Sequence, residues 1–116
     1  MKSFISTTFS INMLKNTLRT GGLATVDVEE VLPRDIPKED LESAVAYEDA
    51  ARVLSTMFNT EIKVNKSSVQ LDDDSDLYVA NFIGGRIPDG ADVLPGNMDV
   101  RFYRVSLVRY NDEDNG

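Results

Sequence analysis

The fold is decided by the stretch LYVANFI at residues 77–83, which carries no charged side chain in seven consecutive positions. Its apolar residues do not alternate regularly with polar ones, as they would in a strand exposed on one face. A continuous apolar run of this length is typical of a strand that is buried on both faces of a sheet. The aspartate-rich segment 72–76 and the glycines at 84 and 85 bound the run as turns. We therefore predict a buried strand over these residues.

Further strands are predicted before and after this run. Residues 4–9 are β-branched and aromatic, and residues 23–31 alternate between apolar and polar side chains. Residues 100–108 predict the final strand, and the segments 60–64 and 67–71 are short strand candidates.

Two segments have the spacing of an amphipathic helix. Residues 11–19 place apolar side chains at 11, 14 and 18, with Ser10 as the N-cap and two glycines after the end. Residues 38–58 carry a longer apolar stripe and follow a connector that contains two prolines. Ser43 could cap a second helix inside this stretch, so one helix, or a short helix and a long one, are both open.

These elements predict one α/β domain of the α+β kind, with a mixed sheet of about five strands that is flanked by helices. A chain of 116 residues suits a single domain. The predicted domain spans residues 1–110, and residues 111–116, NDEDNG, are expected to be a disordered acidic tail.

The composition removes most catalytic chemistries. The chain has no cysteine and no histidine, which excludes disulfides, zinc sites, thiol nucleophiles and histidine-based dyads. The acidic segment 72–76 lacks the glycine and the closing glutamate of a calcium loop. We therefore expect no metal and no cofactor. Carboxylate, amine, guanidinium and hydroxyl chemistry remain, or binding alone.

The charge balance limits the partners. Twelve Lys and Arg stand against 20 Asp and Glu, and the net charge of −8 argues against polymeric nucleic acid. It leaves room for a small anion in a local pocket. The chain has no apolar run of about 18 residues and no signal peptide at its start, so we expect no membrane contact and a cytoplasmic location.

Three features could bind such an anion. Ser10 precedes a predicted helix whose first N–H groups suit a phosphate oxygen. Gly84-Gly85-Arg86 would let a guanidinium donate two hydrogen bonds to phosphate, with the Asp89 carboxylate within reach. Tyr47 could line a pocket and stack on a base. An ordinary N-cap, a surface turn and a core tyrosine are the simpler alternatives, and they stay open.

Six segments, taken in order, match the motifs of a known family: FSINML at 9–14, ESAVAY at 42–47, NK at 65–66, LYV at 77–79, GGRIPDG at 84–90 and FYRV at 102–105. The chain resembles, over most of residues 4–108, a small viral protein family of archaeal viruses, phages and integrated elements. That family includes the ring nucleases that act as type III anti-CRISPR proteins. The resemblance implies a homodimer that binds a cyclic tetra-adenylate second messenger across its two-fold axis and needs no metal.

The resemblance also implies roles for particular residues. Ser10 and Arg86 would contact phosphate, and Asp89 would replace the family's glutamate. Tyr47 stands where known members carry the histidine that protonates the leaving oxygen. The matching motifs place further residues in the ligand site: Ile11, Asn12, Asn65, Lys66, Gly84 and Gly85.

A phenol exchanges protons less readily than an imidazole, so a tyrosine in that position favours binding without cleavage. We expect a viral or prophage immune-evasion protein that sequesters a cyclic oligoadenylate, or a related cyclic nucleotide, in a dimeric pocket in the host cytosol. One alternative is a slow, metal-independent ring nuclease that uses Tyr47 and Asp89 and leaves 2′,3′-cyclic phosphate ends. A second alternative is a non-catalytic protein-interaction module.

Overall fold

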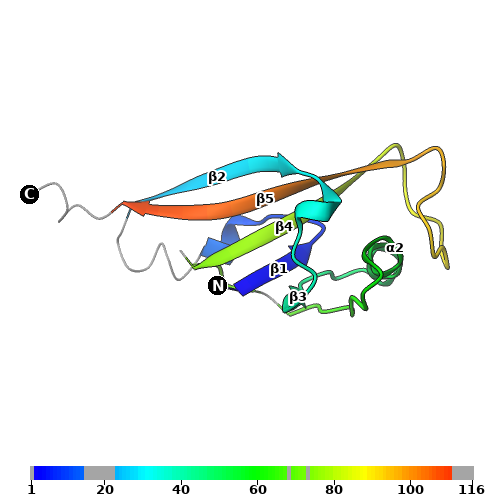
Figure 1. Ribbon diagram of the computed structural model, residues 1–116, viewed down its shortest axis with the longest axis horizontal. Coiled ribbons are helices and arrows are strands. Elements are labelled where there is room, and N and C mark those ends of the chain that lie inside the picture. Colours follow the sequence, from blue (N-terminus) through cyan, green and yellow to red (C-terminus); the bar gives the residue numbers. More distant parts are fainter. Residues whose placement is uncertain (1, 15–22, 68, 73, 111–116) are drawn as a thin grey trace, which may run out of the picture.

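The computed structural model describes residues 2–14, 23–67, 69–72 and 74–110, which form one five-stranded sheet packed against an α-helix (Figure 1). The strand order is β2-β5-β4-β1-β3, with β1 parallel to β3 and β4, and with β5 antiparallel to β2 and β4. The predicted fold class, a single α+β domain with a mixed sheet of five strands, is confirmed. The strands are β1 (Lys2–Ser6), β2 (Leu23–Val31), β3 (Leu41–Ser43), β4 (Ser75–Ile83) and β5 (Asp99–Tyr110).

Strand β4 is buried on both faces, as its apolar run predicts. It lies between β5 and β1. Leu77 belongs to the apolar cluster on one face of the sheet, whereas Tyr78 and Ala80 belong to the cluster on the other. Successive side chains of a strand point to opposite faces, so only an apolar run without alternation can supply both clusters.

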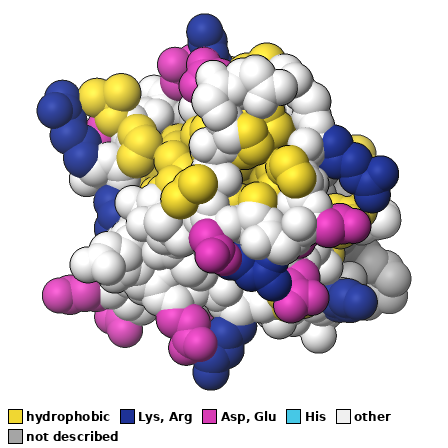
Figure 2. All heavy atoms as spheres, turned by 90° about the vertical axis from the view of Figure 1, so that its right-hand side faces the viewer, with side chains coloured by type: hydrophobic (Ala, Val, Ile, Leu, Met, Phe, Trp, Pro, Cys, Tyr) yellow, Lys and Arg dark blue, Asp and Glu magenta, His cyan; other side chains and the backbone are white. Residues whose placement is uncertain are grey.

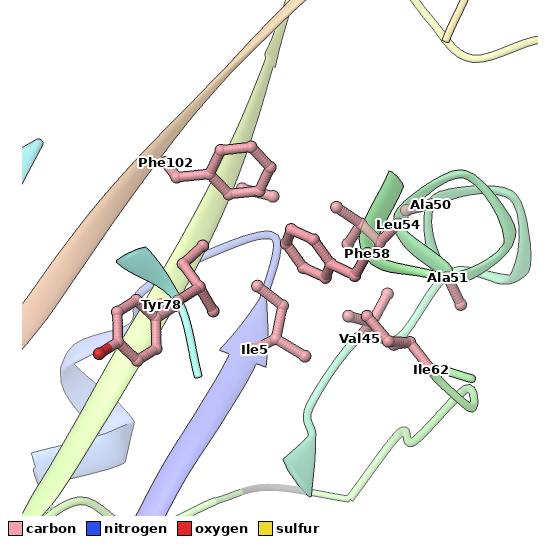
Figure 3. Packing of buried hydrophobic residues seen from close by; sticks show 11 residues of the cluster. Ile5, Val45, Ala50, Ala51, Leu54, Phe58, Ile62, Tyr78 and Phe102 are labelled. Carbon is pink, nitrogen blue, oxygen red and sulfur yellow. The ribbon is translucent and has the colours of Figure 1, made fainter. Parts of the chain in front are cut away.

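The helix α2 (Glu48–Phe58) packs over one face of the sheet. Figure 3 shows its Leu54 and Phe58 side chains turned toward Ile5 of β1 and toward β4 and β5. The rings of Phe58 and Phe102 lie 5.5 Å apart, centroid to centroid. The opposite face of the sheet is covered by the short 3-10 helix η1 (Ile11–Leu14) and by part of the segment between α2 and β4. Leu14 of η1 and Leu71 of that segment are buried against Leu77.

The prediction of a helix from residue 38 is wrong for its first ten residues. Asp40 has a positive φ of 59°. The chain then runs as β3 beside β1, with Ser43 opposite Ile5, and the Ala44 N–H donates to the carbonyl of Ile5 at 2.7 Å. Pairing of the otherwise open edge of β1 therefore overrides the helical spacing of these residues. The first of the two prolines before them, Pro33, begins another 3-10 helix, η2 (Pro33–Asp35), and the second, Pro37, follows that helix.

The short strand candidates at 60–64 and 67–71 are also wrong where the structure describes them. The segment makes isolated backbone hydrogen bonds instead of a ladder, from the Asn65 N–H to the Val45 carbonyl and from the Leu71 N–H to the Met13 carbonyl, each 2.8 Å long. Ile62 and Leu71 are buried as single anchors. These two side chains fill positions in the core although the backbone around them forms no strand.

The first strand ends earlier than predicted, and only part of the predicted first helix lies within the described residues. Strand β1 ends at Ser6, because the buried Ser6 hydroxyl accepts a hydrogen bond from the Thr8 N–H at 3.2 Å and turns the chain. The predicted helix at 11–19 is described only as η1, since residues 15–22 lie outside the described residues, as does the predicted acidic tail. Among the described helices, none is long and apolar enough to cross a membrane.

Candidate functional site

A hollow of about 390 Å³ opens where β1 ends, between the first turn of α2 and the loop that follows β4. Strands β1, β3 and β4 are parallel, so their carboxyl ends meet at this edge of the sheet. In sheets with parallel strands, ligands bind at this edge. We call the hollow the strand-end pocket, and its described lining is Thr7, Tyr47, Asp49, Ala50, Phe82, Arg86 and Ile87.

Tyr47 lies on the rim of this pocket rather than in a helix. It is the N-cap of α2, with extended backbone angles of −114° and 130°, and its side chain is 70% exposed. The interpretation of Tyr47 as a core residue on a helical stripe is therefore wrong. An exposed aromatic ring beside a hollow offers a flat surface on which a base could stack.

Arg86 reaches the same pocket because two glycines turn the chain out of β4. Gly84 has a φ of +99°, and a Cβ there would lie 2.9 Å from the backbone oxygen of Asn97. Only glycine fits this close approach of the two ends of the loop. Gly85 also has a positive φ, of +145°. Within the described residues Arg86 forms no ion pair, either with Asp89 or with any other carboxylate.

Asp49 is the residue of this pocket that the sequence did not indicate. Its Oδ1 accepts a hydrogen bond from the Gly90 N–H at 3.3 Å and another from Arg52 Nη1 at 3.4 Å. Arg52 also pairs with Glu48 at 3.2 Å and with Asp92 at 3.6 Å. These contacts connect the loop after β4 to the first turns of α2. From the sequence alone, such charges on a helix indicate only a solvated face.

A second, smaller hollow of about 150 Å³ lies on the other side of the turn at residues 6–10. We call it the hydroxyl notch, because four hydroxyl side chains, of Ser6, Thr8, Ser10 and Ser67, line it. Thr7 faces the strand-end pocket, so one short turn borders both hollows. The full described lining is Ser6, Thr8, Ser10, Asn12, Met13, Ala44, Ser67 and Val69.

Ser10 does act as a local cap, since its hydroxyl accepts from the Asn12 N–H at 3.3 Å. The described helix after it has only four residues and is of the 3-10 type. A helix this short has little dipole, so the described part gives no support to a phosphate site at a helix N-terminus. Ser10 and Asn12 instead belong to the hydroxyl notch, whereas Ile11 is 70% exposed and lines neither hollow.

The remaining predicted residues have other positions. Both polar atoms of the Asn65 side chain form hydrogen bonds within the protein. Its Nδ2 donates to the Ser43 carbonyl at 2.8 Å, and its Oδ1 accepts from the Ser67 N–H at 2.9 Å. It therefore attaches the segment before β4 to the end of β3. Lys66 and Asp89 are exposed and line neither hollow.

A third hollow, of about 250 Å³, lies further along the sheet on the strands β2 and β5. Arg104 pairs there with Glu29. Burial raises the pKa of the neighbouring Tyr78, and Asp76 adds to this increase while Arg104 opposes it. The arginine is already engaged by protein groups, so this hollow offers no free cation for an anion. Its described lining is Asp27, Val28, Glu29, Arg104 and Ser106.

The class of protein is thus a small α+β domain with a ligand-sized pocket at the carboxyl ends of its parallel strands. The chain belongs to the STIV B116-like family, whose model matches residues 3–104. Among solved structures it is similar to B116 of Sulfolobus turreted icosahedral virus, with 21% identity and a TM-score of 0.70 over 91% of this chain and 99% of that one. No curated protein matches. The structural match establishes the shared fold.

Proposed function

We propose that this protein is a viral or prophage immune-evasion protein that binds a cyclic nucleotide second messenger and removes it from host antiviral signalling. The observation that carries the proposal is that Tyr47 and Arg86 meet at one pocket. An aromatic ring, and a guanidinium that forms no ion pair with the described residues, suit a base and a phosphate. A volume of about 390 Å³ falls within the usual range of small-molecule sites.

The neighbouring hydroxyl notch supports a ligand with more than one nucleotide. Its hydroxyl groups can donate to a second phosphate or accept from a ribose, and it shares the turn at residues 6–10 with the strand-end pocket. A cyclic oligoadenylate is larger than either hollow. We therefore propose that two copies of the chain enclose it as a homodimer.

The chemistry of the pocket favours holding the ligand over cleaving it. A chain without histidine lacks the group best suited to proton transfer near neutral pH. Tyr47 is the one phenol in the described lining, and Asp89, the other catalytic candidate, lies outside it. Slow cleavage of the ring remains the second proposal, because the Tyr47 hydroxyl and Arg86 border the same hollow and could act together on a leaving oxygen.

The test is to incubate the protein with cyclic tri-, tetra- and hexa-adenylate and with cyclic dinucleotides, and to remove unbound ligand. The protein is then denatured by heat, and the released ligand is identified by mass spectrometry. Intact ligand in stoichiometric amount supports sequestration. Linear products with 2′,3′-cyclic phosphate ends indicate the nuclease, and absence of any retained ligand refutes both.

A pair of arginine variants locates the site. Arg86→Ala is expected to weaken binding at least about tenfold, since charged hydrogen bonds contribute about 1.5–3 kcal/mol. Arg34→Ala removes the same charge from an exposed position in η2, outside the described lining, and should leave binding unchanged. Equal losses in both variants would indicate a non-specific charge effect. Sedimentation with and without ligand tests the homodimer.

A further inference from the structure

We propose that Asp49 fixes the orientation of the ligand and selects it, by accepting a hydrogen bond from an amino group of the base or from a ribose hydroxyl. This inference rests on the proposed nucleotide site. It adds a specificity-determining residue to a pocket whose sequence-predicted members are Tyr47 and Arg86.

The position of Asp49 is set from two sides. It is the second residue of α2, and its side chain is one-third exposed where the pocket opens. Both of its protein hydrogen bonds, from Gly90 and Arg52, end on Oδ1. Within the described residues Oδ2 receives none. A carboxylate that is held in place by one oxygen thus keeps the other oxygen for a ligand.

The two charged residues give the pocket opposite hydrogen-bonding characters. A carboxylate only accepts hydrogen bonds, and a guanidinium only donates them. Asp49 therefore disfavours a phosphate nearby and requires a donor, whereas Arg86 requires an acceptor. The other large lining side chains, Tyr47, Phe82 and Ile87, supply apolar surface.

A nucleotide matches this arrangement, because its phosphate accepts hydrogen bonds while its base and ribose can donate them. Figure 2 shows the end of the molecule with α2 and the loop before β5, where apolar side chains are exposed among acidic and basic ones. Two donors on a nucleotide could meet Asp49: an exocyclic amine, which adenine has and hypoxanthine lacks, and the ribose 2′-hydroxyl. Both satisfy the same free carboxylate oxygen.

The experiment measures the dissociation constants of 5′-AMP, 5′-IMP and 2′-deoxy-AMP by NMR titration of the isotope-labelled protein. If the amine binds Asp49, 5′-AMP should bind about tenfold or more tightly than 5′-IMP, since one charged hydrogen bond is lost. If the ribose binds it, 5′-AMP should exceed 2′-deoxy-AMP by a similar factor. In Asp49→Asn either preference should fall to about twofold or less, because an amide can donate as well as accept.

Asp92→Asn is the matched control. Asp92 contacts the same arginine as Asp49 but lies outside the described pocket lining, so the preference should persist. Asp49→Ser is the second variant if the asparagine variant unfolds, which its own spectrum would show. Equal binding of all three nucleotides, unaffected by Asp49→Asn, would overturn this inference and leave the nucleotide site intact. Failure of every nucleotide to bind would overturn both.

Discussion

Replacing Gly84 by alanine should destabilise the protein by about 2–5 kcal/mol. The new Cβ would lie 2.9 Å from the backbone oxygen of Asn97, which cannot move like the end of a flexible side chain. Overpacking of this kind costs about 1–3 kcal/mol. The φ of +99° adds about 1–2 kcal/mol, because side chains disfavour left-handed backbone.

Three glycines provide an internal scale for this prediction. Gly85→Ala keeps the strain of a positive φ but meets no atom within 4 Å, so it should cost about 1–2 kcal/mol. Gly96→Ala meets nothing within 4 Å and has no such φ, and it should be neutral or slightly stabilising. Urea unfolding of the three variants gives the comparison. If Gly84→Ala and Gly96→Ala unfold at the same urea concentration, the close approach of the loop ends is refuted.

Two further predictions concern Tyr78 and Arg52. Burial raises the pKa of Tyr78 above its ordinary value of 10, so the folded protein keeps this proton to higher pH than the unfolded chain, and the free energy of unfolding should fall as the pH rises above about 10. Tyr78→Phe should make this decline shallower in alkaline urea titrations. Tyr103→Phe, on the opposite face of the sheet, serves as the control. Equal slopes in the wild-type protein and both variants would contradict the raised pKa. Arg52→Ala should speed hydrogen exchange at Gly90 up to about fivefold, since exposed ion pairs contribute at most about 1 kcal/mol. Glu48→Gln removes a partner of Arg52 within α2 and should leave that amide unchanged, and a matching increase there would argue against the link between helix and loop.

The strands that the sequence patterns located correctly are those whose own order of apolar and polar side chains is typical of a strand. Strand β2 alternates between apolar and polar side chains over residues 24–29, and β4 contains a largely apolar run without charges. By contrast, β3 has helical spacing and becomes a strand because the edge of β1 needs a partner. That partner is distant in sequence, so no local pattern could reveal the pairing.

The residues of the candidate site also divide into those that sequence patterns indicate and those that only the fold brings together. The sequence motifs led to Tyr47 and Arg86, and the structure places both at one pocket. Asp49 was missed because its contact with Gly90 joins residues 41 positions apart. On the helix its ion-pair partner is Arg52, three residues away, and a pair of this kind is typical of a solvated helix face. The fold brings the loop after β4 to Asp49, and the spacing of residues along the helix does not reveal this contact.

The position of β5 has a consequence for how this chain folds. Within the sheet, β2 pairs only with β5, and β5 also pairs with β4, so the last strand joins β2 to the rest. In the same way, β1 cannot pair with β4 until that later segment of the chain is available. Nearly every ladder therefore closes a long loop, which slows folding to the range of milliseconds to seconds typical of non-local topologies. During synthesis the sheet cannot be completed until β5 has left the ribosome.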